Sequence, residues 1–194
     1  MHQCTKPFRH GRWRRRTLAV LFFLYPAGVL GGPVISREEA LAAAYSEAAI
    51  EAERIFLTER QLRQAEALCG EEIPSPLIAR YTAIRDGKIV GRAYIDTHVV
   101  RTKNESLLIC LDQAGKVRRI EVTAFMEPPE YQASEAWLNQ YRDKHLSDDL
   151  HLQRSIRAIA GATLTALAAN RAVRRVLAID RVLTQTVAHS RAKK

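Results

Sequence analysis

Cysteine is scarce in this chain, which has three cysteines among its 194 residues, and the usual motifs of cysteine and histidine chemistry are missing. There is no CxxC pair, no CxxCH haem-attachment site and no HExxH zinc motif, and the six histidines show no metal-ligand spacing. No Gly-x-Ser-x-Gly nucleophile elbow occurs, and nothing in the sequence orients His151 toward Ser155 or Thr163. Thiol-redox, c-type haem, zinc and serine-hydrolase chemistries are therefore disfavoured.

The two cysteines outside the first 35 residues leave two interpretations open. Cys69 and Cys110 can pair in an oxidising compartment. Cys110, however, lies within the apolar run 107–111 (LLICL), which predicts a buried strand. A small buried hydrophobic residue is therefore the favoured interpretation of Cys110.

Acidic residues are absent from the first 32 positions, which hold six of the 30 Lys and Arg residues. The remainder carries 24 basic against 21 acidic residues, so the net charge of +9 falls to +3 without this segment. A nucleic-acid-binding protein is expected to keep a basic face in its folded body. The charge distribution therefore argues against a nucleic-acid partner.

Residues 1–35 have the layout of a signal peptide or an N-terminal membrane anchor. A basic stretch at 12–16 (RWRRR) precedes the apolar run 17–25 (TLAVLFFLY), and 26–32 (PAGVLGG) supplies helix-breaking and small residues. The apolar run can be extended to nearly membrane length, so the cleaved and anchored alternatives stay open. Either one predicts that the body is periplasmic, or lies on the extracytoplasmic face of the inner membrane, in a bacterial cell.

The body, residues 36–189, is predicted to be one α+β domain followed by a basic tail at 190–194. A capping box at 36–39 (SREE) predicts a helix that continues over 40–54, and a second box at 58–61 (TERQ) predicts a helix to about Leu68. Gly70 is placed to end the second helix. Both helices are expected to pack against a sheet.

Residues 77–126 predict an antiparallel meander of about four strands. The expected strands are 78–84, 88–95, 105–111 and 116–125, with a tight turn at Asp86-Gly87. The segment 96–104 is expected to be a polar, mostly extended connection. The pair Arg118-Arg119 breaks the alternation of the last strand by one residue and predicts a bulge there.

The C-terminal third is expected to contain a proline loop at 127–131 (EPPEY), a short helix at 135–142 and a long helix over 163–189. The pattern of the long helix divides its residues into two sets. The set predicted to face the core is Leu164, Leu167, Ala168, Val173, Val176, Leu177 and Leu183. The set predicted to lie mostly on solvated faces is Arg171, Arg174, Arg175 and Arg181.

The segment 160–165 (AGATLT) is the centre of the functional prediction. Gly161 with the small Ala160 and Ala162 permits close approach of the backbone to a ligand. The long helix begins directly afterwards, and free N–H groups at a helix N-terminus form an anion site. We expect a phosphate on the N–H groups of Ala162, Thr163 and Leu164, with Thr165 beside them.

The sequence Gly161-Ala162-Thr163-Leu164-Thr165 resembles the signature of the FMN-binding domain family, Ser/Thr-Gly-Ala-Thr-x-Ser/Thr before a C-terminal helix. That family includes the flavin-carrying subunits of the Na⁺-translocating NADH:quinone oxidoreductase and of Rnf complexes. The segment Glu127-Pro128-Pro129 is similar to the family's Glu-Thr-Pro-Gly loop near the flavin, and 87–91 (GKIVG) resembles its opening hairpin.

The resemblance implies FMN as cofactor, an electron-carrier role, and partners in a membrane redox complex or a quinone-linked chain. It also implies that a flavin transferase can esterify Thr163 to the FMN phosphate. Ala160 stands where the family has Ser or Thr, and 155–157 (SIR) where the transferase favours an aspartate. Covalent attachment therefore stays open, as does a binding or assembly module of the same fold without flavin.

Further candidates for the flavin surroundings are weaker. The predicted slot for the isoalloxazine ring is formed by Pro128, Pro129, Tyr131 and Trp137. The predicted counter-charges for the phosphate are Arg154 and Arg157. Thr97 and His98, in the polar connection, complete the candidates.

Overall fold

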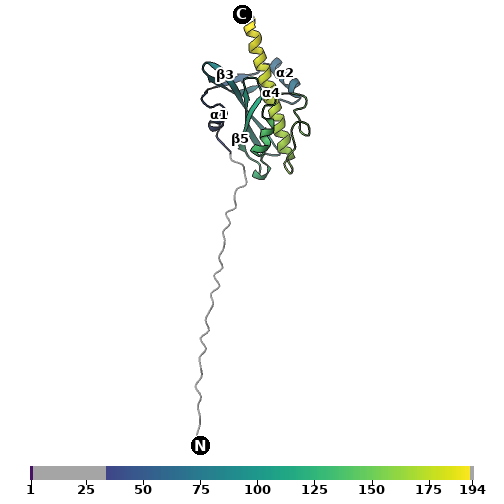
Figure 1. Ribbon diagram of the computed structural model, residues 1–194. Coiled ribbons are helices and arrows are strands. Elements are labelled where there is room, and N and C mark those ends of the chain that lie inside the picture. The colour runs from purple at the N-terminus through teal and green to yellow at the C-terminus, as the bar shows by residue number, and fades with distance from the viewer. Residues whose placement is uncertain (2–33, 193–194) are drawn as a thin grey trace.

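A five-stranded antiparallel sheet lies between two unequal helical layers in the computed structural model (Figure 1). The structure describes Met1 and residues 34–192. The strands follow chain order as a meander, β1-β2-β3-β4-β5. The leader predicted at 1–35 lies almost wholly outside the described residues. Within them, no helix is both long and apolar enough to cross a membrane.

The helices and strands have the following bounds: α1 Arg37–Ala44, β1 Ala49–Phe56, α2 Glu59–Cys69, β2 Leu77–Arg85, β3 Lys88–Val99, β4 Asn104–Asp112, β5 Val117–Phe125, η1 Pro129–Tyr131, α3 Glu135–Leu138, η2 Asn139–Tyr141 and α4 Thr163–Ala192. The predicted α+β class, with an antiparallel sheet and a long C-terminal helix, is confirmed.

The alternation of β4 divides the core into two parts. Leu107, Ile109 and Leu111 pack toward α2 and α4, in the larger cluster of buried residues. Leu108 and Cys110 point to the opposite face, where α1 covers them. Both described cysteines are buried and free, and they belong to different faces of the sheet. The prediction that Cys110 is a small buried hydrophobic residue is confirmed.

Short sequence motifs predicted the positions of α2 and of the bulge in β5 correctly. Thr58 and Gln61 form the predicted capping box, and Gly70 ends the helix with φ 69° in the left-handed region. In β5, Cys110 pairs with Arg119 and Leu111 pairs with Val117, so Arg118 is the extra residue. These features are encoded by residues next to one another in sequence.

The helix predicted over 40–54 is wrong beyond Ala44. The chain turns after Tyr45, whose hydroxyl lies 2.7 Å from the carbonyl oxygen of Arg92 and 2.8 Å from that of Leu111. Residues 49–56 then form β1, which pairs with β2 along its whole length. This edge strand is exposed over most of its residues, so it lacks the apolar alternation that marks a strand. Its conformation is determined by the edge of β2.

The segment 96–104 is extended in its first half, as predicted, but residues 96–99 belong to the strand and not to a connection. β3 continues to Val99, and only residues 100–103 form the turn to β4. The polar side chains of Asp96 and His98 are accommodated under α4, because partners from α4 and β4 hydrogen-bond to them. A strand that buries charged groups gives no apolar signal in the sequence.

The assignment of faces to α4 needs two corrections. Leu164 and Leu167, predicted to face the core, are exposed. Arg174 and Arg175, predicted to be solvated, are buried. Arg174 donates hydrogen bonds to the carbonyl oxygens of Cys69, Ser147 and Leu150, which explains why its burial is tolerated.

Polar side chains connect β3 to α4 near the turn between β4 and β5. The guanidinium of Arg92 pairs with the carboxylate of Asp180, with Nη2 and Oδ2 3.0 Å apart. The hydroxyl of Tyr94 donates to the other carboxylate oxygen of Asp180 at 2.8 Å. All three residues are buried. A single acidic side chain therefore holds two groups of the central strand against the helix.

Candidate functional site

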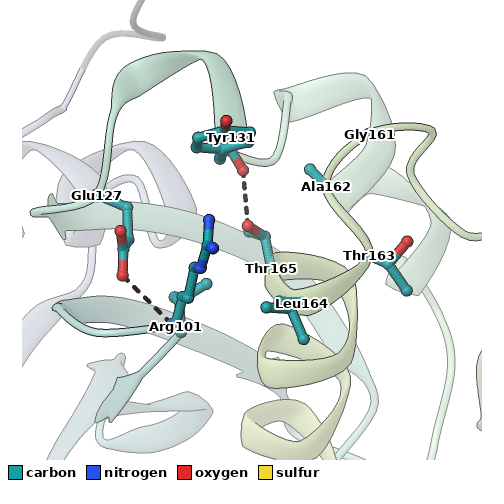
Figure 2. Close-up of a pocket in the computed structure, with 9 residues that line it drawn as sticks. Arg101, Glu127, Tyr131, Gly161, Ala162, Thr163, Leu164 and Thr165 are labelled. Carbon is teal, nitrogen blue, oxygen red and sulfur yellow. Dashed lines mark hydrogen bonds between the residues drawn. The ribbon is translucent and has the colours of Figure 1, made fainter.

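The turn before α4 lines a small pocket of about 80 Å³ at the end of the sheet where β3 stops and β5 ends. One wall is formed by residues 161–165, which the sequence predicted. The opposite wall is formed by Val100, Arg101, Glu127 and Tyr131 (Figure 2). The structure thus brings Glu127 and the segment 161–165 together, although they belong to separate loops of the chain.

The N-terminus of α4 has no side-chain cap. The residue before Thr163 is Ala162, which carries no side-chain oxygen to accept from the first turn. The N–H groups of Thr163, Leu164 and Thr165 therefore lack an intrahelical acceptor. The N–H of Ala162 itself donates to the carbonyl oxygen of Ile159 at 3.3 Å, so it already has an acceptor within the turn.

Gly161 makes the tight entry into this helix. Its φ of 79° lies in the left-handed region, which residues with a Cβ adopt at a cost. A Cβ added at Gly161 would meet no heavy atom within 4 Å. The requirement for glycine is therefore conformational rather than steric.

The two threonines of the turn have different environments. Thr165 is buried, and its hydroxyl donates to the carbonyl oxygen of Tyr131 at 2.7 Å. Thr163 is exposed, and its side chain points away from Arg101 and Tyr131 (Figure 2). Thr165 thus fixes the 3-10 turn η1 against α4, whereas the hydroxyl of Thr163 is open to solvent.

Glu127 shapes the opposite wall. Its Oε1 accepts from the backbone N–H groups of Arg101, Thr102 and Lys103 at 3.3, 2.6 and 2.8 Å. These hydrogen bonds, with that of Thr102 foremost, hold the pKa of Glu127 below its ordinary value. The carboxylate is consequently ionised near neutral pH and holds the turn between β3 and β4. This explains why a carboxylate is found beside a predicted anion site.

Arg101 is the cation of the pocket, and sequence reasoning missed it. Its backbone is fixed by Glu127, and its side chain extends between Glu127 and Thr165 (Figure 2). The predicted counter-charges Arg154 and Arg157 do not line the pocket. Arg154 donates to the carbonyl oxygen of Asp148 instead. In the sequence, the only indication of Arg101 was its position directly after Val99 and Val100 in the polar segment 96–104.

The predicted ring slot is brought together only in part. Tyr131 lines the pocket, but Pro128, Pro129 and Trp137 do not. Pro128 and Pro129 begin η1 and so position the carbonyl oxygen of Tyr131 that accepts from Thr165. Trp137 is buried, and its indole N–H donates to the carbonyl oxygen of Arg157 at 2.7 Å. Its role is in packing.

A second hollow of about 180 Å³ adjoins the first and shares Val100 and Leu164 with it. Its remaining lining comes from the end of β3 and the first three turns of α4: His98, Val99, Leu167, Ala168, Arg171 and Arg175. Several of the exposed large apolar side chains of the described chain lie on residues of these two hollows: Val99, Tyr131, Leu164 and Leu167. The two hollows form a partly apolar surface beside the turn.

A buried charged network lies at the floor of the second hollow. The ring of His98 lies between Asp96 Oδ1 at 2.9 Å and Glu105 Oε2 at 3.0 Å. Arg175 donates two hydrogen bonds to Asp96, at 3.0 and 2.7 Å. Burial alone would lower the pKa of His98, but the hydrogen bonds to Asp96 and Glu105 outweigh it and raise the pKa above its ordinary value. His98 is therefore the second partner of Asp96, and it also lines the second hollow.

This network predicts a loss of stability as the pH rises. The pKa of His98 is higher in the folded than in the unfolded chain, where it is about 6.5. The stabilisation by charged His98 is therefore complete below about pH 6.5 and is lost as the pH rises through the folded pKa. Urea unfolding between about pH 6 and about pH 9 should show the wild type losing its advantage over His98→Gln.

His151→Gln is the control for this prediction. Burial lowers the pKa of His151, so its contribution to the pH dependence has the opposite sign. An advantage over His98→Gln that stays constant through the whole pH range would show that folding does not change the pKa of His98. An advantage that grows as the pH rises would show that His98 is neutral in the fold.

Comparison of the chain with protein-family models, with curated proteins and with solved structures gave no match. The likeness to the FMN-binding domain family thus depends on the residues of the turn and of the Glu127 loop. In the part of the chain that the structure describes, no group of three or more His, Cys, Asp and Glu side chains is arranged to hold a metal ion.

Proposed function

We propose that the chain is an FMN-binding flavoprotein that carries electrons for a membrane-associated redox chain. The observation that supports this best is the uncapped N-terminus of α4 facing Arg101 across a pocket whose wall is the Gly-Ala-Thr turn. Backbone N–H groups and a guanidinium together match the acceptor oxygens of a phosphate.

The size of the pocket limits what it can hold. Its volume of about 80 Å³ is well below the ~300 Å³ of pockets that enclose a whole small ligand. The first hollow would hold the phosphate of FMN, and the apolar side chains of the second, Val99 and Leu167 among them, would contact its isoalloxazine ring. A ring on an open surface is accessible to a partner protein.

The side chains around the pocket have separate roles in the proposed binding of FMN. Arg101 neutralises the phosphate, Glu127 fixes the backbone of Arg101, and Thr165 holds Tyr131 against the helix. The flavin itself supplies the redox chemistry when bound, so no catalytic acid or base of the protein is required. The partners are then a membrane redox complex or quinone-linked electron carriers, and the predicted leader accounts for an extracytoplasmic location.

Arg101→Gln should weaken FMN binding by about tenfold or more, because a charge-assisted hydrogen bond is worth about 1.5–3 kcal/mol. Quenching of flavin fluorescence on titration of the full chain measures this affinity. Riboflavin, which lacks the phosphate, should bind more weakly than FMN and with the same affinity to the wild type and to Arg101→Gln. Arg154→Gln, outside the pocket, should leave FMN binding unchanged.

A binding or assembly module of the same fold without flavin is the second candidate. Ala160, in place of the family's hydroxyl residue, and the small volume of the pocket favour it. A colourless protein that takes up no added FMN would establish this alternative. Equal affinities for riboflavin and FMN would overturn the phosphate site itself.

A further inference from the structure

A fork opens in the sheet between β2 and β3. The last residues paired between these strands are Arg80 and Tyr94. Beyond that pair, β2 extends to Leu77 and β3 extends to Val99, each paired only with its outer neighbour, β1 or β4. The central sheet thus separates into two arms at the end that also carries the turn of α4.

The fork holds a cavity of about 470 Å³, larger than either hollow beside the turn of α4. Its lining comes from both faces of the sheet. Tyr81 belongs to the cluster under α1, whereas Ile78, Val176 and Ile179 belong to the cluster under α4. The cavity therefore passes through the plane of the sheet, and its volume lies in the range of about 300–1,000 Å³ typical of small-molecule sites.

The interior of the fork is apolar in part. Five branched side chains from four segments line it: Ile73, Ile78, Ile95, Val176 and Ile179. Asp96 is the acidic group in the wall, and Arg175 neutralises it through two hydrogen bonds. The wall thus offers no uncompensated negative charge to a ligand.

Two arginines, Arg37 and Arg54, lie at the mouth of the fork, on the side of the sheet that α1 covers. Arg37 donates to the hydroxyl of Tyr81 at 3.1 Å, and its guanidinium carbon lies 5.5 Å from the centre of that ring. The same guanidinium forms an ion pair with Glu38. Arg54 is exposed in β1 and forms no ion pair with any residue that the structure describes. Its neighbour Glu53 is already paired with Arg80. The mouth therefore presents the charge of Arg54 beside a partly apolar interior.

The depth of the fork determines what kind of ligand it accepts. The unpaired part of β2 covers residues 77–79 and ends at the Arg80–Tyr94 pair, which corresponds to about 10 Å of strand. A peptide strand inserted there would be blocked after about three residues. A short molecule that enters from the mouth meets no such obstacle.

We propose that this fork binds a small amphipathic anion. The apolar body lies between β2, β3 and α4, and a carboxylate or phosphate group lies at Arg54 and Arg37. The site shares no lining residue with the pocket at Thr163. Its one residue in common with the second hollow is Arg175, whose guanidinium is bound to Asp96.

Isothermal titration of the full chain with decanoate, below its micelle-forming concentration, tests the proposal. We expect saturable binding of one molecule per chain, and Arg54→Gln should weaken it about tenfold. Arg60→Gln is the matched control, because Arg60 is an exposed arginine of α2 that does not line the fork. Ala79→Phe, which adds a ring to the lining, should weaken binding further.

Decyl phosphate and decyltrimethylammonium complete the experiment. Tighter binding of decanoate assigns the site to carboxylates, and tighter binding of decyl phosphate assigns it to phosphate esters. Should Ala79→Phe fail to fold, the comparison of Arg54→Gln with Arg60→Gln still decides. Equal loss in those two variants, equal binding of the cationic probe, or no saturable binding to the wild type would each overturn the proposal. FMN affinity should not change in Ala79→Phe, which separates failure of this site from failure of the flavin site.

Discussion

Asp180→Ala is expected to destabilise the protein by about 3–5 kcal/mol and to lower its melting temperature by about 10 °C. Asp180 is buried and is the acceptor for both Arg92 and Tyr94. Burial alone would lower the pKa of Arg92, but its pairing with Asp180 outweighs that effect and raises the pKa. Alanine at 180 would leave a buried guanidinium without a counter-charge and a buried hydroxyl without an acceptor.

Equilibrium unfolding in urea, with circular dichroism as the signal, measures this loss. Glu59→Ala is the control, because the Glu59–Arg63 pair is exposed and its loss should cost less than about 1 kcal/mol. The double variant Arg92→Met with Asp180→Leu should recover much of the loss, because an apolar pair leaves no uncompensated charge. A loss for Asp180→Ala as small as that for Glu59→Ala would show that water reaches Arg92 in solution.

The parts of the fold that the sequence predicted are those determined by residues close together in the chain. The limits of α2 were predicted because Thr58, Gln61 and Gly70 act within a few residues of the helix ends. The bulge at Arg118 was predicted because it shifts a local alternation. Such features need no knowledge of the rest of the chain.

The features that sequence reasoning missed depend on partners distant in sequence. β1 is a strand because β2 pairs with it, and its exposed residues carry no pattern of their own. Arg175 is buried because Asp96, 79 residues away, accepts its hydrogen bonds. A charged residue at such a position looks in the sequence like a solvated one, since the pairing is made only by the fold.

The candidate site shows the same difference between features set by neighbouring residues and features set by residues distant in sequence. The turn 161–165 and Glu127 were predicted to belong together, and they line one pocket. Arg101 was missed because its proximity depends on the three hydrogen bonds from residues 101–103 to Glu127. The carboxylate of Glu127 thus brings Arg101 to the predicted anion site. In the sequence, these two charged residues are seen only as members of separate loops.

Thr163→Val is expected to abolish covalent attachment of FMN completely while leaving non-covalent binding within about twofold of the wild type. Ester formation requires a hydroxyl that reaches the phosphorus of a flavin phosphate carrying an activating group, loses its proton to the transferase and forms the new O–P bond as that activating group leaves. Thr163 is the exposed hydroxyl of the turn, at the first position of α4 beside the uncapped N–H groups, and its side chain has to turn toward Arg101 to reach a phosphate held there. Thr165 is the other hydroxyl of the turn, but it is buried and donates to Tyr131.

Intact-mass analysis of protein made in cells that contain the flavin transferase decides between these residues. The wild type and Thr163→Ser should carry the mass of one FMN phosphoester, and Thr163→Val should not. Thr165→Val removes the hydrogen bond to Tyr131 but keeps the hydroxyl of Thr163, so it should still be modified. A wild type without the added mass, together with FMN binding that depends on Arg101, would leave a non-covalent flavin site. Ala160, where the family's hydroxyl residue is absent, would then be the residue to restore first, by Ala160→Ser.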